Sequence, residues 1–288
     1  MSNKVYEIVT QQITNLLEKG EIPWKKPWKS TGGAMNLVSK RPYRGINQFL
    51  LNCSEYSSPY WLSFKQCSDR GGRIKKDERS TVVVFWKWLN TVREYGVDDE
   101  ESKIVKVPLL RYYRVFNLEQ TEGIPHPPEE TVSNPFTPIE QAEQVIQDMP
   151  LRPDIRYTGD RAAYSPMLDY VMLPPKEAFH SSEEFYSTAF HELAHATGHQ
   201  SRVGRKGILE PSYFGSHTYS QEELVAEFCA SMLCGVTGIE QATIENSAAY
   251  IQGWLKVLKN DKKVLVHAAA QAQKASYYIL RKDPTEDQ

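Results

Sequence analysis

The chain of 288 residues has few of the features that mark secreted, membrane-spanning or disulfide-stabilised proteins. Only four cysteines are present, and no two of them have the C-x-x-C spacing of a metal or redox motif. No apolar run approaches the ~20 residues that cross a membrane, and the first dozen residues are polar, unlike a secretory signal. We therefore expect a cytoplasmic protein with reduced thiols, no membrane partner and one large or two ordinary domains.

The net charge is small, but it is unevenly distributed. Residues 1–125 carry 20 Lys and Arg against 14 Asp and Glu, whereas residues 126–288 carry 14 against 22. Five of the six tryptophans also lie in the first part. Residues 123–138 hold five of the 17 prolines, which is typical of a linker. We predict an α+β protein with domains at 1–125 and 139–288, joined by a linker at 126–138.

Hydrophobic periodicity predicts the elements of both parts. In the first part we expect a helix at 3–19, a short helix that begins at Asn47 and a helix from about Trp61 to Cys67. We also expect strands at 81–88 and 104–116, with an acidic hairpin tip between them at 93–103. In the second part we expect helices at 139–148, 245–258 and 262–281, the last packing against the metal helix described below, and a two-stranded hairpin at 155–175. We expect Asp169 to Leu173 to be its edge strand, where an extended peptide could bind by strand addition.

Aromatic and basic residues are interleaved in the first part. The segment IPWKKPWKS contains two prolines and cannot form a regular helix. Flat rings that stack on bases, beside cations that meet phosphates, are typical of proteins that bind single-stranded nucleic acid. Buried tryptophans and solvated charges are the alternative explanation. The candidate DNA-binding residues are Trp24, Lys25, Lys26, Trp28, Tyr43, Arg44 and Lys76.

The second part contains a metal-binding motif of the form HExxH. His191 and His195 are four residues apart, so they lie on one face of a helix and can bind a single Zn²⁺. Glu192 between them is placed to act as the general base on a water whose pKa zinc lowers to roughly 7. Ser181, followed three residues later by Glu, predicts a helix beginning near Ser182. An ordinary helix with surface histidines is the alternative.

A catalytic zinc usually has a third protein ligand, which we expect from a helix at 218–233. Glu223 and Glu227 are four residues apart, and we assign Glu223 as the ligand and Glu227 as the acid that holds a metal-bound histidine. Glu222 points about 100° away from Glu223 and is a less favoured ligand. Ser220 and Glu223 could instead form a capping box, in which case Glu227 would be the ligand.

The loop between these two helices and the start of the second helix contain three residues that could stabilise a developing oxyanion. These residues are Arg202, His217 and Tyr219.

The chain resembles one known family, the ArdC-type plasmid antirestriction proteins. In the first part the resemblance rests on IPWKKPW, YRGIN, GGRIKKDERSTVVVFWK and RYYRVFNLEQ. In the second part it rests on FHELAHATGHQSRVGR, YSQEELVAEF and WLKVLKNDKKVLVHAAAQAQKA. The motifs agree in order from about residue 4 to 282, and the first part is also similar to the N-terminal domain of TraC-type conjugative primases.

This resemblance implies an N-terminal α+β domain that binds single-stranded DNA and a mainly helical, zincin-like metallopeptidase domain with a small sheet. It implies protection of incoming plasmid DNA from host restriction during conjugation, and it allows transfer to the recipient cell with that DNA. A peptide or protein, such as a host restriction component, would be the substrate. His191 and His195 match the metal ligands, Glu192 the catalytic glutamate and Glu223 the third ligand. The alternative is DNA coverage alone, with a structural or inactive metal domain.

Overall fold

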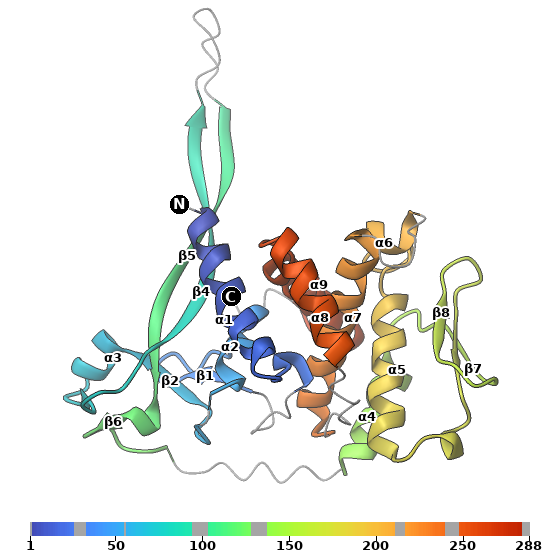
Figure 1. Cartoon of the computed structure of the whole chain (residues 1–288), viewed down its shortest axis with the longest axis horizontal. Helices are drawn as coiled ribbons and strands as arrows, with labels where there is room; N and C mark the ends of the chain where they lie inside the picture. Colours follow the sequence, from blue (N-terminus) through green and yellow to red (C-terminus); the bar gives the residue numbers. More distant parts are fainter. Residues whose placement is uncertain are drawn as a thin grey trace, which may run out of the picture.

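The computed structural model describes residues 2–25, 33–54, 56–93, 103–127, 137–210, 217–239 and 248–283 (Figure 1). The described elements of the first part are α1 (Ser2–Glu18), η1 (Pro23–Lys25), β1 (Met35–Asn36), α2 (Ile46–Asn52), β2 (Tyr60–Ser63), α3 (Phe64–Ser68), β3 (Arg73–Ile74), β4 (Thr81–Arg93), β5 (Lys103–Asn117), η2 (Leu118–Gln120) and β6 (Thr121–Glu122). Those of the second part are α4 (Pro138–Asp148), β7 (Asp154–Tyr157), β8 (Ala163–Ser165), β9 (Tyr170–Leu173), η3 (Lys176–Ala178), α5 (Ser182–Ala196), α6 (Lys206–Leu209), α7 (His217–Thr237), α8 (Ala248–Asn260) and α9 (Val264–Ile279). The predicted α+β class in two parts is confirmed.

The first part is built on a four-stranded sheet with the order β1-β2-β5-β4. Strands β4 and β5 pair antiparallel from Thr81 opposite Val115 to Arg93 opposite Lys103, and they extend as a ribbon beyond the other strands (Figure 1). Both strands were predicted, but the hairpin tip at 94–102 lies outside the described residues. The helix predicted around Trp61 is shorter than expected, because Trp61 lies in β2 and pairs with Asn117 of β5.

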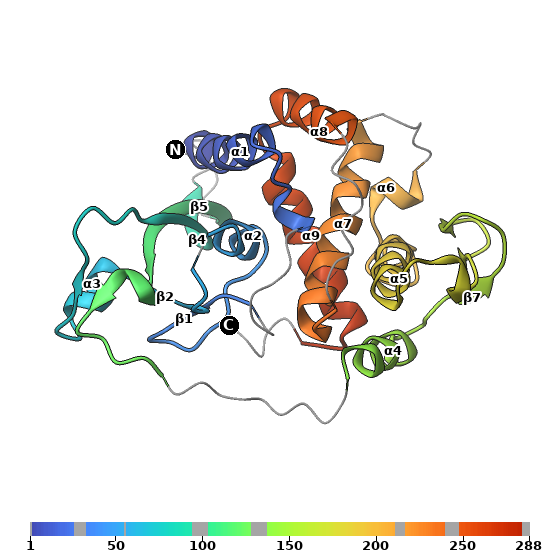
Figure 2. The same ribbon diagram turned by 60° about the horizontal axis from the view of Figure 1, so that its bottom comes forward.

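In the second part, α7 packs against both α5 and α9, and α9 also contacts α5 as predicted (Figure 2). A three-stranded sheet with the order β7-β9-β8 lies beside α5. The prediction that Asp169 to Leu173 form an edge strand is wrong. β9 is the central strand, because β7 pairs with it in parallel on one side and β8 pairs with it antiparallel on the other.

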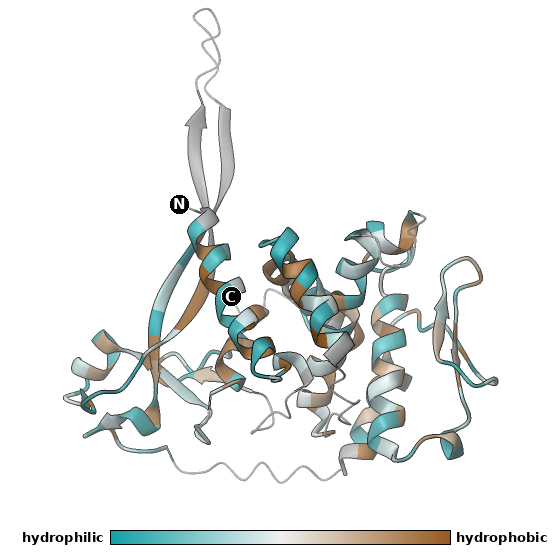
Figure 3. Cartoon of the chain, in the orientation of Figure 1, coloured by the Kyte–Doolittle hydropathy of each residue, from teal (hydrophilic) through white to brown (hydrophobic). Residues whose placement is uncertain are grey.

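One hydrophobic core runs through both parts. Helix α1 places Val5, Val9, Ile13 and Leu17 on one buried face, and it contacts β5 on one side and α8 and α9 on the other. Hydrophobic and hydrophilic residues alternate along α1 in Figure 3, as expected for a helix with one face in the core. No helix among the described residues is both long and apolar enough to span a membrane.

Trp24 belongs to this shared core and not to the protein surface. Its side chain is fully buried, and its Nε1 donates a hydrogen bond of 3.2 Å to the hydroxyl of Tyr250. The indole meets Phe228 and Trp254 edge-on, with ring centroids 5.2 and 5.8 Å away. The prediction that Trp24 stacks on a DNA base is contradicted by this burial, because no face of the ring is accessible.

The Trp24→Ala variant should lower the free energy of unfolding by about 3–5 kcal/mol, the usual cost of truncating a buried tryptophan. Urea denaturation measures this change. Met167→Ala, at a side chain that is 93% exposed, is the control and should change stability by no more than about 0.5 kcal/mol. Unchanged stability together with weaker DNA binding in Trp24→Ala would contradict the core assignment.

Candidate functional site

Helix α5 begins where the sequence predicts. The hydroxyl of Ser181 accepts a hydrogen bond from the backbone N–H of Glu184 at 3.1 Å, and the Glu184 carboxylate accepts one from the N–H of His180 at 2.8 Å. Phe185, Ala189 and Leu193 are buried on the core side of the helix. This packing fixes the rotation of α5, so His191 and His195 point toward α7.

His191, His195 and Glu223 form a three-residue cluster with metal-ligand chemistry. The Nε2 atoms of the two histidines lie 3.2 Å apart. The Glu223 carboxylate lies 3.5 Å from Nε2 of His191 and 3.6 Å from Nε2 of His195. Ligands 2.0–2.1 Å from a tetrahedral zinc are separated by about 3.4 Å. Oε2 of Glu223 makes the first of these contacts and Oε1 makes the second. With one donor atom from each residue, the three atoms lie within 4.8 Å of one another, which is close enough for a single bound ion.

The cluster is rich in negative charge, which favours a cation. Burial lowers the pKa of His191, but a hydrogen bond with Glu223 and the charges of Glu227, Glu192 and Glu223 outweigh it and raise this pKa to about 9. Burial raises the pKa of Glu223, but its contacts with His191 and His195 and a hydrogen bond from Tyr219 lower this pKa below its usual range. A divalent cation would satisfy the same carboxylates.

A buried ion pair, Glu222 with Arg205, holds one of the two histidines of the cluster. Nδ1 of His195 lies 3.3 Å from Oε1 of Glu222, which leaves Nε2 directed at the cluster. Arg205 donates to both carboxylate oxygens of Glu222, with Nε 2.9 Å from Oε2, and its Nη2 also donates to the carbonyl of Ala194 at 2.7 Å. Burial raises the pKa of Glu222, but the hydrogen bonds from Arg205 and His195 lower it below its usual value.

The acid that holds a ligand histidine is thus Glu222, and the role predicted for Glu227 is not observed. The Glu227 carboxylate instead accepts a hydrogen bond of 2.9 Å from the hydroxyl of Tyr250. The capping alternative at Ser220 is also excluded, because α7 begins at His217 and Ser220 lies inside its first turn. Glu223 is therefore free of a capping role and lies beside both histidines.

Glu192 and Tyr219 lie at the cluster. The Glu192 side chain is only 7% exposed, and its charge acts on both His191 and Tyr219. Burial, the charge of Glu223 and a hydrogen bond to Glu223 raise the pKa of Tyr219 to about 12, so its hydroxyl stays protonated at neutral pH.

The other two candidates for oxyanion stabilisation are engaged elsewhere. Arg202 donates to both oxygens of Asp169, at 2.8 and 2.9 Å, and to the carbonyls of Leu151 and Ala196. His217 pairs with Asp261 at 2.9 Å. Of the three candidates, Tyr219 is the one that contacts the cluster.

The candidate DNA-binding residues that the structure describes do not gather at one place. Tyr43 is 7% exposed and packs with Val83 and Val115, whereas the guanidinium of Arg44 lies over the ring of Tyr277 in the second part. Lys76 is exposed in the turn after β3. Lys26, Trp28 and the side chain of Lys25 lie outside the described residues.

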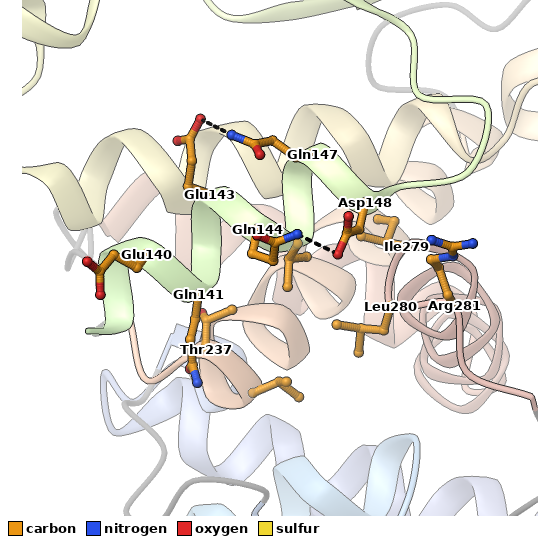
Figure 4. A pocket seen from close by; sticks show the side chains of 12 residues that line it. Glu140, Gln141, Glu143, Gln144, Gln147, Asp148, Thr237, Ile279, Leu280 and Arg281 are labelled. Atoms are coloured by element: carbon orange, nitrogen blue, oxygen red, sulfur yellow. Dashed lines mark hydrogen bonds between the residues drawn. The ribbon is translucent and has the colours of Figure 1, made fainter. Parts of the chain in front are cut away.

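A separate cavity of about 500 Å³ lies between α4 and the C-terminal ends of α7 and α9 (Figure 4). Val145, Val236 and Leu280 line it, and the polar side chains of α4 form its rim. None of the metal-cluster residues reaches this cavity, so it is not part of the metal centre.

Comparison with known proteins supports this two-part architecture. Residues 3–116 match the family model for the N-terminal domain of the anti-restriction factor ArdC, and residues 140–271 match that for a zincin-like metallopeptidase. The metal-free crystal structure of the antirestriction protein ArdC from the R388 plasmid matches with a TM-score of 0.74 and 32% identity, covering 96% of this chain and 98% of that one. The chain belongs to the ArdC family of antirestriction proteins. The resemblance recognised in the sequence is thus confirmed.

Other relatives extend the ArdC comparison. A Mn(II)-bound structure of the R388 ArdC has a TM-score of 0.73 and 33% identity, over 96% of this chain and 97% of that one. The DNA primase TraC of Escherichia coli is 33% identical over 96% of this chain, but the chain spans only 27% of that primase. Protein y4eC of Sinorhizobium fredii (strain NBRC 101917 / NGR234) is 31% identical over 96% of this chain and 91% of its own length.

The Glu222→Gln variant should weaken metal binding by about 10- to 100-fold, because the acid that orients a ligand histidine loses its charge. Glu227→Gln, five residues along the same helix, is the comparison and should weaken binding less, because Glu227 bonds Tyr250 and acts on His191 only through its charge. Calorimetric titration of the metal-free protein measures both. Glu222→Asp keeps the charge in case the glutamine variant does not fold. Equal effects of the glutamine changes at 222 and 227 would contradict the assignment of Glu222.

Proposed function

We propose that this chain is an antirestriction protein that binds single-stranded DNA and carries a zinc peptidase centre. In this proposal it shields incoming plasmid DNA from host restriction during conjugation, acting in the cytoplasm and able to enter the recipient cell with the DNA. The observation that carries the peptidase part is the spacing of His191, His195 and Glu223, with Glu192 beside them. Membership of the ArdC family supports the antirestriction role.

Zinc is the metal that this donor set favours. Two imidazole nitrogens and one carboxylate oxygen are typical of catalytic zinc sites, and the three side chains bring such atoms within 4.8 Å of one another. The R388 relative binds Mn(II) in its crystal structure. Nitrogen and oxygen sites hold zinc more tightly than manganese in general, so we propose that Mn(II) replaces zinc when it is abundant.

The residues of the chain have separable roles in peptide hydrolysis. A bound metal would supply Lewis acidity and a more acidic water. The Glu192 carboxylate accepts the proton of the attacking water and passes it to the leaving amine. The protonated hydroxyl of Tyr219 exchanges its hydrogen bond to Glu223 for one to the oxygen of the substrate carbonyl as negative charge develops there. Glu222 and Arg205 hold the His195 ring in place throughout.

The substrate would be an extended peptide or a segment of a host restriction protein. Strand β8 is an edge strand of the β7-β9-β8 sheet and contacts α5, the helix that carries His191 and His195. Among the described strands it pairs only with β9, so its outer edge suits strand addition, the role that the sequence had suggested for residues 169–173. A peptide paired there would pass along the helix that holds the metal ligands.

A second candidate function is DNA coverage without proteolysis. The first part carries a net excess of positive charge and has its own sheet, separate from the metal ligands. Restriction could then be blocked by occupancy of the DNA alone. The two functions differ in whether antirestriction needs Glu192.

The metal assignment is tested by mass spectrometry of purified protein. We expect one zinc ion per chain in the wild type and none in Glu223→Ala, because two histidines alone bind zinc weakly. Glu177→Ala, an exposed carboxylate in η3, is the control and should keep the metal. Metal retained in Glu223→Ala would contradict the three-ligand site.

The peptidase assignment is tested with Glu192→Gln, which removes the base without removing a metal ligand. Metal content should be unchanged, and the hydrolysis rate should fall by about 10²- to 10⁴-fold, the usual contribution of a general base. The measurable consequence is plasmid transfer into restricting recipients, normalised to non-restricting ones. We expect transfer to fall to the level without the protein. Full protection by Glu192→Gln would instead support DNA coverage alone.

A further inference from the structure

The face of the β4–β5 ribbon that is turned away from α1 carries an aromatic and basic surface. Phe85 of β4 lies opposite Arg111 of β5, and Tyr113 is two residues further along β5. Cross-strand partners and alternate residues share a face, so these three side chains project together. The rings of Phe85 and Tyr113 touch edge to face with centroids 5.8 Å apart, yet they are 38% and 37% exposed. We call Phe85, Arg111 and Tyr113 the Tyr113 surface.

A polar pocket adjoins the Tyr113 surface and shares Tyr113 with it. Its volume is about 520 Å³, and Asn36, Arg41, Tyr43, Lys65 and Gln66 are among its lining residues. The side-chain amides of Asn36 and Gln66 exchange two hydrogen bonds, at 3.1 and 3.2 Å, and Asn36 also donates to the hydroxyl of Tyr43. These contacts fix the pocket wall before any ligand binds, and the volume is that of a small-ligand site.

The charges around the pocket select an anionic ligand. Arg41 and Lys65 line it, and Arg111 stands beside it on the sheet. The acidic residue in the lining is Asp69, which Lys65 neutralises at 2.9 Å. Arg41 and Arg111 have no ion-pair partner within the part of the chain that the structure describes, so both remain available to phosphates.

Among the described residues, the opposite face of the same ribbon lacks this combination of exposed aromatic rings, cations and a polar pocket. Val84 and Leu110 project there, and both are buried in the core that includes α1. Tyr112 and Arg114 share that face, and neither is among the residues that line the polar pocket beside Tyr113. Exposed rings beside cations and an adjoining pocket therefore occur together on the Tyr113 side.

We propose that single-stranded DNA crosses the Tyr113 surface, with bases stacked on Tyr113 and Phe85, the backbone held by Arg111 and Arg41, and one nucleotide seated in the Asn36–Gln66 pocket. This inference rests on the proposed DNA-binding function and specifies where the DNA lies. Unpaired bases are required, because in a duplex the neighbouring base pairs already cover both faces of each base and leave none for an aromatic ring. It replaces Trp24, which is buried, as the aromatic platform.

The test uses the full chain and fluorescence anisotropy with a labelled oligo(dT) of about 20 nucleotides. Tyr113→Ala should weaken binding by about 5- to 150-fold, the effect of losing one stacked base, and Tyr113→Phe should restore it. Arg111→Gln should lower the slope of log affinity against log salt by about one, because one phosphate contact is lost. Thermal melts confirm that each variant is folded.

Matched controls come from the other face of the same strand. Tyr112 is 38% exposed and next to Tyr113, and Arg114 is exposed like Arg111. Tyr112→Ala and Arg114→Gln should change affinity by less than about twofold. Equal losses on both faces, or no loss in Tyr113→Ala, would overturn the assigned surface while DNA binding itself stands. No binding by the wild type would overturn the proposed function, and tighter binding of oligo(rU) would overturn DNA as the ligand.

Discussion

The metal centre depends on one buried ion pair, between Arg205 and Glu222. Both residues are 6% exposed, so neither charge could stay in the interior without the other. Arg205 also bonds Ala194 and Thr197 at the end of α5, so the pair joins that helix to α7. Because Glu222 contacts Nδ1 of His195 as well, the same carboxylate sets the orientation of a ligand ring. The relative rotation of the two ligand-bearing helices is therefore fixed before a metal binds.

The same helix α7 connects the metal centre to the first part of the chain. Phe228, five residues after Glu223, packs on Phe49 with centroids 4.4 Å apart and on Trp24. Trp24 donates to the hydroxyl of Tyr250, which donates in turn to Glu227. Trp24 and Glu227 were assigned separate functional roles from the sequence, and the structure uses both in one buried contact between the two parts. Tyr250 is the side chain that joins them.

An element or a site residue can be predicted from the sequence when the contacts that determine it are local in the chain. Helices α1, α5 and α9 and strands β4 and β5 follow from periodicity, and His191, Glu192 and His195 follow from spacing within a single helix. The sequence could not identify Glu222, rather than Glu227, as the acid that holds a ligand histidine. That assignment depends on the position of Arg205, which is set by how the loop after α5 and α6 pack against α7. A Cβ atom on Gly207 would lie 2.9 Å from Cβ of Glu222, so α6 covers the acid closely because a glycine is there. The order of the strands could not be predicted for the same reason, because β9 is central only as a result of its pairing with β7.

The β5 strand shows why alternation alone cannot locate a binding surface. The sequence Arg111-Tyr112-Tyr113-Arg114 places one tyrosine and one arginine on each face of the sheet, so the two faces are equivalent in composition. The packing of each face breaks this equivalence. Helix α1 covers the face of Val84 and Leu110, whereas the opposite face packs Val83 and Val115 against Tyr43 and adjoins a pocket. Helix α1 also contacts α8 and α9, so one amphipathic helix covers one sheet face and joins the sheet to the helices around the metal centre. The arrangement of both sites then depends on the apolar stripe of α1, whose residues belong neither to the metal cluster nor to the lining of the pocket.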